Sequence, residues 1–360
     1  MHMKNALLTA IAGVGMVVLA QTGFADPADD LLRTEMASHR IPGAALKVIK
    51  DGKAVKTSVY GQANLELGVP VTADTVFEIG SVTKQFTAAC ILLLQQDGKL
   101  SVEDKIGKHL PNLPVAWTNV TIRHLLTHTS GIKSYTGLNG FELTEHLTQD
   151  QFIKKLGTQP LEFSPGDSWK YSNSGFSLLG YIVENVSGTN YWQFLRTRIL
   201  QPLGMNATTD RRPGTVIQHR ADGYEQTNHV HINRDYDLTD VFAAGAIVST
   251  VGDLAKWNAA LDTDELLTAE TKTQMWTPQL LNNGKATKYG FGWFIEAVEG
   301  HRNIGHGGST SGFSASLQRF PDDRLTIILL TNTDEQIAST LARKLAVIYF
   351  PSLKPDQAKK

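Results

Sequence analysis

A serine and a lysine three residues apart stand at the start of a long apolar helix that the sequence predicts. Ser81 follows Gly80, and Lys84 precedes the apolar run from Phe86 to Leu94. At this spacing both side chains lie on one helical face, so the amine can take the proton of the hydroxyl. Burial or a nearby cation must lower the lysine pKa for this to happen at neutral pH. The pair predicts a nucleophilic serine; the alternative is a capping serine beside a solvent-facing lysine.

A tyrosine and an asparagine two residues apart form the second candidate group. Tyr171 and Asn173 follow the turn residues Ser164-Pro165-Gly166 and precede a predicted helix. In an extended segment both project to the same side. A phenol can relay a proton when cations hold it near its ionised form, and an amide can hold a lysine and donate to a substrate carbonyl. The alternative is that Asn173 or Ser174 caps the helix and Tyr171 packs in the core.

A glycine-rich segment supplies the third group, with His306, Gly308 and Ser309 just before a predicted strand that starts at Phe313. Glycines in strands mark the close approach of a ligand or of another backbone. If this edge lies beside Ser81, the N–H groups of Ser81 and Ser309 would stabilise an oxyanion. His306 would then place a titratable ring at the mouth, and kcat/KM should rise through roughly pH 6 to 7 if that ring must be neutral. The alternative is a glycine loop with a surface histidine.

Strand signals stand at both ends of the chain, and helix signals stand between them. Strands are predicted over 44–49, 54–60, 290–298, 313–320 and 325–330, with a closing helix over 336–349. We therefore predict an α+β fold, in which N- and C-terminal strands form one antiparallel sheet flanked by helices, with a mainly helical inserted lobe. Residues 26–360 would form one catalytic domain, with an α/β lobe over about 26–80 and 282–360 and a helical lobe over about 81–281. A site is expected in the cleft between the lobes.

The first 25 residues have the pattern of an export signal. Lys4 provides a positive start, Ala6 to Ala20 is mostly apolar, and small residues precede a cleavage point before Asp26. The apolar run is short for a transmembrane span. We therefore expect a periplasmic or secreted protein with no stable membrane span once the signal is removed; an uncleaved anchor is the alternative.

Composition excludes several classes of protein. The chain of 360 residues balances 34 basic against 35 acidic residues, so no basic stripe indicates a nucleic-acid partner. The single cysteine, Cys90, excludes an intramolecular disulfide and any multi-cysteine zinc site. His124 and His128 lack the glutamate of a zinc-peptidase motif, and His229 and His231 lack a third ligand. We expect no metal and no cofactor, and a small-molecule or peptide substrate.

Together, Ser81-x-x-Lys84, Tyr171-x-Asn173 and His306-Gly307-Gly308 resemble, in order and separation, three motifs of the serine β-lactamase superfamily. The tyrosine in the second motif is similar to the class C branch, which includes class C β-lactamases, D-alanyl-D-alanine carboxypeptidases and family VIII esterases. Further similar segments, 128–132, 221–224 and 244–254, extend the resemblance over about Leu31 to Phe350. Absence of a Gly-x-Ser-x-Gly motif counts against an α/β-hydrolase.

The resemblance implies a role for each residue. Ser81 would be the acylated nucleophile, Lys84 would help to deprotonate it, and Tyr171 would shuttle the proton to the leaving group. Which of Lys84 and Tyr171 is the base stays open, since the two would titrate as a unit. The resemblance also implies that Asn173 holds Lys84 and that His306 tunes Tyr171. It implies contacts with the substrate for both of these residues and for Gly308, Ser309 and the wall residue Tyr224.

The third motif departs from the β-lactamase pattern. His306-Gly307-Gly308 stands where those enzymes have Lys-Thr-Gly, whose charge and hydroxyl help to bind a substrate carboxylate. Ser309, Thr310 or an arginine from 208–240 would have to compensate. We therefore expect a serine hydrolase of carboxypeptidase or esterase type, acting on a small ester, amide or D-amino-acid peptide. The alternatives are a penicillin-binding or sensing module that is acylated without efficient turnover, and a β-lactamase.

Overall fold

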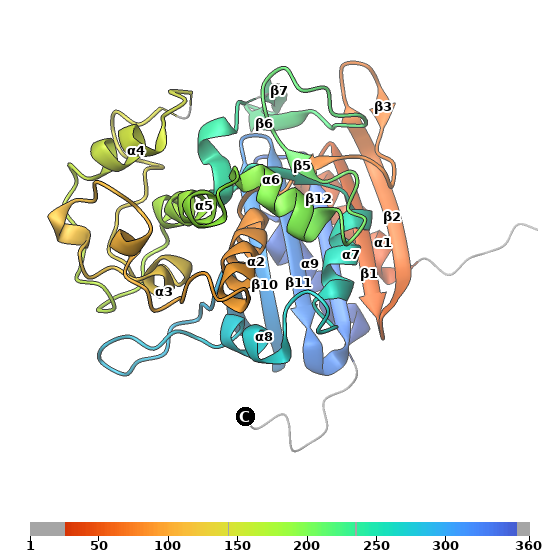
Figure 1. The fold of residues 1–360 in the computed structure, drawn as a ribbon. Coiled ribbons are helices and arrows are strands. Elements are labelled where there is room, and N and C mark those ends of the chain that lie inside the picture. Colours follow the sequence, from red (N-terminus) through yellow and green to blue (C-terminus); the bar gives the residue numbers. More distant parts are fainter. Residues whose placement is uncertain (1–25, 143, 235, 351–360) are drawn as a thin grey trace, which may run out of the picture.

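The computed structural model describes residues 26–350 except 143 and 235, so the predicted export signal lies outside the described residues. Figure 1 shows a sheet with helices on both faces and a helical lobe beside it. The α+β arrangement predicted from the sequence is confirmed. Within the described residues no helix has the length and apolar character needed to cross a membrane.

Both ends of the chain build one sheet of seven antiparallel strands, in the order β3-β2-β1-β12-β11-β10-β9. The two ends meet where β1 pairs with β12, from Ala44 opposite Thr331 to Lys50 opposite Leu325. The strands are β1 (Gly43–Lys50), β2 (Lys53–Asn64), β3 (Val69–Pro70), β9 (Phe294–Val298), β10 (His301–Thr310), β11 (Phe313–Phe320) and β12 (Leu325–Thr331).

The sequence predicted that the glycine-rich segment precedes the strand that starts at Phe313. In the structure this segment is itself a strand, β10. β11 pairs with β10 from Ile304 to Thr310, whereas β9 pairs with it only as far as Gly305. The stretch from His306 to Thr310 therefore has one unpaired edge within the described sheet. Such an edge leaves backbone N–H groups available to another segment or to a ligand.

Helices cover both faces of the sheet. The apolar side chains on both faces of the central strands are therefore buried. α1 (Pro27–His39) and α9 (Ala338–Tyr349) form one apolar cluster with β1 and β12. On the other face lie α2 (Thr83–Gln96) and α7 (Val251–Ala260), and α2 buries every residue from Thr83 to Leu94. A helix that is buried all round, as α2 is, belongs to the centre of a large core.

The remaining elements form the helical lobe and its borders. Three of these helices begin after a residue whose side-chain oxygen accepts from a backbone N–H, as is common at N-caps. These residues are Thr121, Thr148 and Asn190. The helices are α3 (Ile122–Leu126), α4 (Gln149–Leu156), α5 (Asn173–Ser187), α6 (Tyr191–Leu195) and α8 (Ala269–Met275). The short strands are β4 (Phe77–Glu78), β5 (Thr209–Asp210) and β8 (Ile247–Ser249) in one sheet, and β6 (Gly223–Thr227) with β7 (Val230–Arg234) in another.

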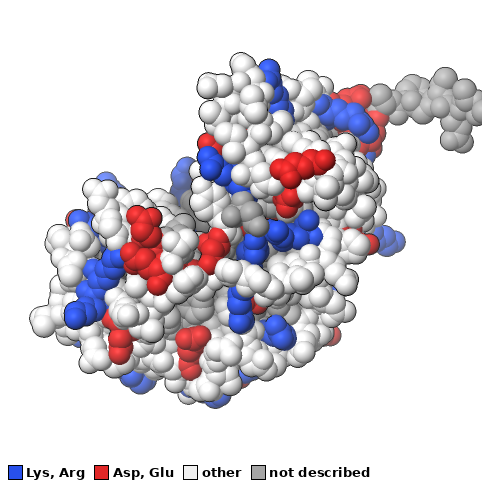
Figure 2. Space-filling view, turned by 90° about the horizontal axis from the view of Figure 1, so that it is seen from above, with Lys and Arg blue, Asp and Glu red and all other residues white. Residues whose placement is uncertain are grey.

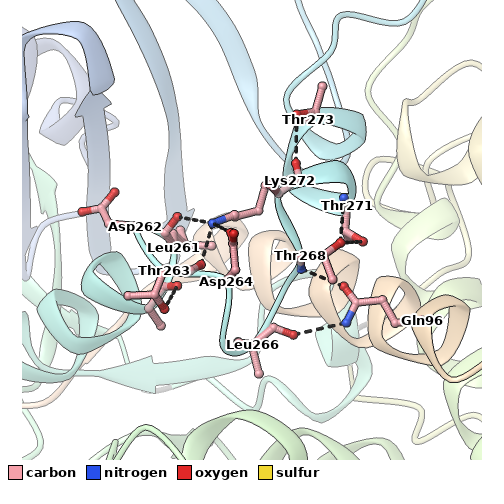
Figure 3. A network of polar contacts seen from close by, with 12 residues as sticks. Gln96, Leu261, Asp262, Thr263, Asp264, Leu266, Thr268, Thr271, Lys272 and Thr273 are labelled. Carbon is pink, nitrogen blue, oxygen red and sulfur yellow. Dashed lines mark hydrogen bonds and ion pairs between the residues drawn. The ribbon is translucent and has the colours of Figure 1, made fainter.

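A polar network fastens the end of α2 to the segment before α8 (Figure 3). The Gln96 amide donates to Leu266 O and accepts from Thr268 N. Lys272, on α8, donates to the carbonyls of Leu261 and Thr263 and pairs with Asp264 at 2.8 Å. The C-terminal end of the helix that carries Lys84 is thus held by tertiary contacts.

Charge is interspersed on the face shown in Figure 2, where neither the blue nor the red atoms form a continuous stripe. Red carboxylate atoms lie on the left part of that view and also in its upper part. This distribution matches the balanced composition of the chain.

Candidate active site

Ser81 lies on a single tight turn, Gly80–Val82, that connects β4 to α2. Gly80 has φ +48, and a Cβ there would lie 2.6 Å from Ser309 N, so a side chain at this position would collide with β10. No side-chain cap is present at the start of α2, and Lys84 is fully buried. The alternative of a capping serine beside a solvent-facing lysine is therefore wrong.

The Lys84 amine contacts three neutral groups. Its Nζ donates to Asn173 Oδ1 and to Ala244 O, each at 2.7 Å, and lies 3.0 Å from Ser81 Oγ. No carboxylate of the described residues pairs with it, and burial lowers its pKa well below the ordinary lysine value. A neutral amine has two hydrogens and one lone pair. Both hydrogens serve the amide and carbonyl oxygens, which leaves the lone pair for the proton of Ser81.

Asn173 is the first residue of α5, and its side chain faces the site instead of capping the helix. Oδ1 accepts from Lys84, and Nδ2 donates to Thr136 Oγ1 at 3.0 Å. The N-cap residue is Ser172, whose side chain makes no capping bond. The alternative that Asn173 is a cap is therefore wrong, and its amide fixes the position of the Lys84 amine.

Tyr171 lies beside the same amine, with Lys84 Nζ 4.8 Å from the centre of its ring. Its hydroxyl is buried and makes no hydrogen bond of standard geometry to the described residues. Burial raises the pKa of Tyr171, and the nearby Ser81 hydroxyl opposes that rise only in part. The phenol is therefore protonated at neutral pH, so no cation among the described residues holds it near its ionised form in this site.

β10 runs against the Ser81 turn so closely that only glycine fits at Gly308. A Cβ there would lie 2.0 Å from Ile79 O and 2.7 Å from Ser81 N. The N–H groups of Ser81 and Ser309 therefore belong to two backbone segments in direct contact. Ser81, Tyr171, Gly308 and Ser309 line one pocket of about 510 Å³. Two such donors beside a hydroxyl can stabilise the oxyanion of an acyl-transfer reaction.

His306 is buried, not placed at the mouth as the sequence suggested. Its Nδ1 donates to Gly307 O, so Nε2 accepts from the Tyr289 hydroxyl at 2.9 Å. Burial, together with the nearby Lys84, lowers the pKa of His306 to about 3. The ring is thus neutral at pH 6 to 7, so the structure gives no reason to expect a rise of kcat/KM in that range through His306. The ring centres of His306 and Tyr171 lie 6.1 Å apart.

Two further side chains surround Tyr171 that the sequence did not assign to the site. The His128 ring lies 4.2 Å from the Tyr171 ring, and its Nδ1 accepts from Ser172 N at 3.1 Å. Tyr289 contacts both histidines and is fully buried. The sequence marked His128 only within a segment of family resemblance and as an unlikely zinc ligand, and it gave no signal for Tyr289.

Tyr224 does not line the pocket of Ser81, so the structure does not place it as a substrate wall. It is 2% exposed, and its hydroxyl accepts from Leu65 N at 2.8 Å. This bond fastens the β6–β7 hairpin to the loop after β2, which is a structural contact. The short segment that contains Tyr224 does not show, from sequence alone, whether this tyrosine contacts the substrate or only the fold.

The cation of the Ser81 pocket comes from α9 and not from 208–240. Arg343 lines the pocket and donates to Glu296 Oε2 at 2.6 Å. Arg211 lies elsewhere, 3.7 Å from Glu78, and Thr310 donates to that same carboxylate at 2.6 Å. Neither Thr310 nor an arginine from 208–240 lines this pocket, whereas Ser309 does.

Comparisons with known proteins agree with this arrangement. A family model described as Beta-lactamase matches residues 28–349. Penicillin-binding protein 4* of Bacillus subtilis is 33% identical over 329 residues, which are 85% of this chain and 71% of that protein. The structure of the octameric penicillin-binding protein homologue from Pyrococcus abyssi has a TM-score of 0.78 at 29% identity, over 89% of this chain and 76% of that one. A D-stereospecific amidohydrolase from Streptomyces sp. has a TM-score of 0.78 at 26% identity, over 91% and 100%.

Proposed function

Because the chain belongs to the beta-lactamase family, we propose that it is an exported serine hydrolase that forms an acyl-enzyme on Ser81. The observation that carries this proposal is the Lys84 amine, buried among neutral acceptors and 3.0 Å from Ser81 Oγ. An amine in this setting is a base at neutral pH. Export rests on residues 1–25 alone, which predict a periplasmic or secreted protein.

Acylation begins with transfer of the Ser81 proton to Lys84 Nζ as Oγ bonds to the substrate carbonyl carbon. The carbonyl electrons move to oxygen, and the N–H groups of Ser81 and Ser309 stabilise the negative charge. The carbon–leaving-group bond then breaks, and the leaving nitrogen or oxygen takes the Tyr171 proton. The Lys84 ammonium then gives a proton to the Tyr171 phenolate, so that both groups are neutral again in the acyl-enzyme. In deacylation, water gives its proton to the same pair and Ser81 Oγ leaves protonated.

Lys84 and Tyr171 divide the proton transfers between them. The lowered pKa of Lys84 favours the neutral amine, and the raised pKa of Tyr171 favours the neutral phenol. A neutral amine accepts a proton and a neutral phenol donates one. We therefore assign Lys84 as the base of acylation and Tyr171 as the acid that protonates the leaving group.

The substrate is a small ester, amide or D-amino-acid peptide, with the amidase or carboxypeptidase type favoured over the β-lactamase type. Neutral His306 offers no charge where a β-lactamase would have lysine. The cation in the pocket, Arg343, is shared with Glu296, so it can accept a carboxylate only by sharing or exchanging that partner. The similarity to a D-stereospecific amidohydrolase supports an amide substrate of D configuration.

A second candidate is a penicillin-binding module that is acylated without efficient turnover. The similarity to the Bacillus subtilis protein favours it, since that protein is named for penicillin binding. The two candidates differ only in deacylation. Burst labelling of Ser81 by a penicillin, with no steady-state turnover of any substrate, would support the module.

A substrate panel tests the proposal. It contains p-nitrophenyl esters, D- and L-amino acid p-nitroanilides, a D-Ala-D-Ala peptide and a chromogenic cephalosporin, each run with wild type and Ser81→Ala. We expect multiple turnovers of the D-anilide or an ester, little cephalosporin hydrolysis, and no turnover by the folded variant. Unchanged turnover by Ser81→Ala would remove the acyl-enzyme. Cell fractionation with and without residues 1–25 tests export separately.

A further inference from the structure

A second cavity lies in the helical lobe, apart from the Ser81 pocket. Its volume is about 380 Å³, and it shares no lining residue with that pocket. The walls come from α4, α5, α6 and the short helical segment Thr239–Ala244. A cavity of this size can hold one small organic molecule.

Aromatic rings form much of its wall. The Phe242 ring lies 5.2 Å from that of Tyr181 and 6.1 Å from that of Trp192, and Phe152 lies 5.8 Å from Tyr181. The faces of such rings attract both apolar groups and organic cations. The wall therefore suits a ligand that itself contains an aromatic ring.

Three carboxyl residues, Glu142, Glu184 and Asp240, line the same cavity, and His146 lies beside Asp240. Burial raises the pKa of Glu184 and of Asp240, so part of their solvation has been lost. Among the described residues, Glu184 accepts only from Tyr191 N, and Asp240 accepts from His146 N, which are backbone bonds. A ligand cation would restore the stabilisation that water no longer supplies to these carboxylates.

The two arginines that line the cavity, Arg211 and Arg212, are paired with carboxylates outside it. Arg212 is paired with Asp210, and Arg211 lies 3.7 Å from Glu78, so each has a carboxylate outside the cavity.

The cavity is separated from the catalytic amine by one short stretch of backbone. Phe242, whose φ of 46° is strained for a bulky residue, faces the aromatic wall. Ala243 O accepts from Thr87, and Ala244 O accepts from Lys84. The same segment therefore forms the wall of one cavity and holds the amine of the other.

We propose that this cavity binds a small aromatic amine, with its ring among Phe242, Tyr181 and Trp192 and its ammonium at Asp240 and Glu184. This inference does not depend on the proposed hydrolase activity. The ligand is identified only by its chemistry, a protonated primary amine one or two carbons from a phenyl ring.

Binding of 2-phenylethylamine to the full mature chain tests the proposal, by calorimetry or ligand-observed NMR. The neutral 2-phenylethanol and the anionic 3-phenylpropionate have nearly the same shape and serve as matched probes. We expect the amine to bind at least about 10-fold more tightly than either, since one charge-assisted contact supplies about that factor. Absence of amine binding, or equal binding of the alcohol, would overturn the proposal.

Three amide variants locate the bound amine. Asp240→Asn keeps the acceptor for His146 N and should weaken amine binding about 10-fold. Glu296→Gln removes the carboxylate of the Ser81 pocket, and Glu145→Gln removes a neighbouring carboxylate already paired with Lys155. Both should leave amine binding unchanged. Loss of binding in Glu296→Gln but not in Asp240→Asn would place the amine in the Ser81 pocket and overturn the proposal.

Discussion

Two lysines are buried among the residues that the structure describes, and the groups around them are different. Lys84 is fully buried and contacts Ser81 Oγ, Asn173 Oδ1 and Ala244 O, none of which is charged. Lys272 is 8% exposed and contacts two carbonyls and the Asp264 carboxylate (Figure 3). Burial lowers the pKa of Lys84, which pairs with no carboxylate of the described residues, whereas Lys272 has the Asp264 carboxylate beside it. The comparison teaches that a buried lysine without a carboxylate partner, such as Lys84, can serve as a base, whereas one with such a partner, such as Lys272, has a structural role.

The surroundings of Lys84 are neutral without being wholly apolar. Its Nζ lies 4.8 Å from the centre of the Tyr171 ring and 5.3 Å from that of Phe176. Aromatic faces attract a cation, so the ammonium that forms during acylation is partly stabilised. The site therefore favours the neutral amine at rest and tolerates the charged amine as a transient, as a base requires.

Replacing each lysine by methionine should give the largest effects. The change at Lys84 should lower activity, and the change at Lys272 should lower stability. Lys84→Met should lower kcat/KM by about 10³-fold, since the general base is lost, with the fold intact. Lys272→Met should leave kcat/KM within a few-fold and lower the free energy of unfolding by about 1–2 kcal/mol, because two carbonyls lose their donor. Steady-state kinetics and urea unfolding measure the two effects. Loss of activity in a folded Lys272→Met would break the comparison.

Asn173→Asp should make Lys84 resemble Lys272, because it places a carboxylate where an amide now accepts from the amine. A carboxylate favours the ammonium and so raises the pKa of Lys84. Because the neutral amine is the base, kcat/KM at pH 7 should fall by about 10- to 100-fold and recover as pH rises. The acid limb of the kcat/KM–pH profile should move to higher pH.

Asn173→Ala is the control for that substitution, since it removes the contact without adding a charge. It should lower kcat/KM with no upward movement of the acid limb. An acid limb that stays in place in Asn173→Asp would argue against Lys84 as the base.

The sequence predicted the parts of this site that depend on local spacing. Ser81 and Lys84 are one helical turn apart, so helical geometry alone joins them. The contact of Asn173 with Lys84 came from a resemblance, because no local rule brings residues 89 positions apart together. His128, Tyr289 and Arg343 were missed for the same reason. The burial of His306 depends on the packing of Tyr289 and Phe294 over its ring, which a sequence pattern does not encode.

His306 extends the comparison to a third buried titratable group, which has no carboxylate partner. Its pKa of about 3 means that the ring stays neutral from pH 5 to 8, where an ordinary histidine titrates. The carbon-bound ring protons of His306 should therefore show no NMR shift change across that range. Titration of His306 near pH 6.5 would show that burial in this pocket does not hold groups neutral.

Removing the carboxylate of Lys272 should have the smallest effect of the series. Asp264 is 64% exposed, and an exposed partner contributes at most about 1 kcal/mol to stability, less in high salt. Asp264→Asn should therefore lower the free energy of unfolding by no more than that, and it should not change kcat/KM, because Lys272 keeps its two carbonyl acceptors. Adding a carboxylate beside Lys84 would then alter the reaction, while removing one beside Lys272 alters only stability. A Lys272 made reactive by Asp264→Asn, detected as new acylation of its amine by an activated ester, would show that burial matters more than the counter-charge.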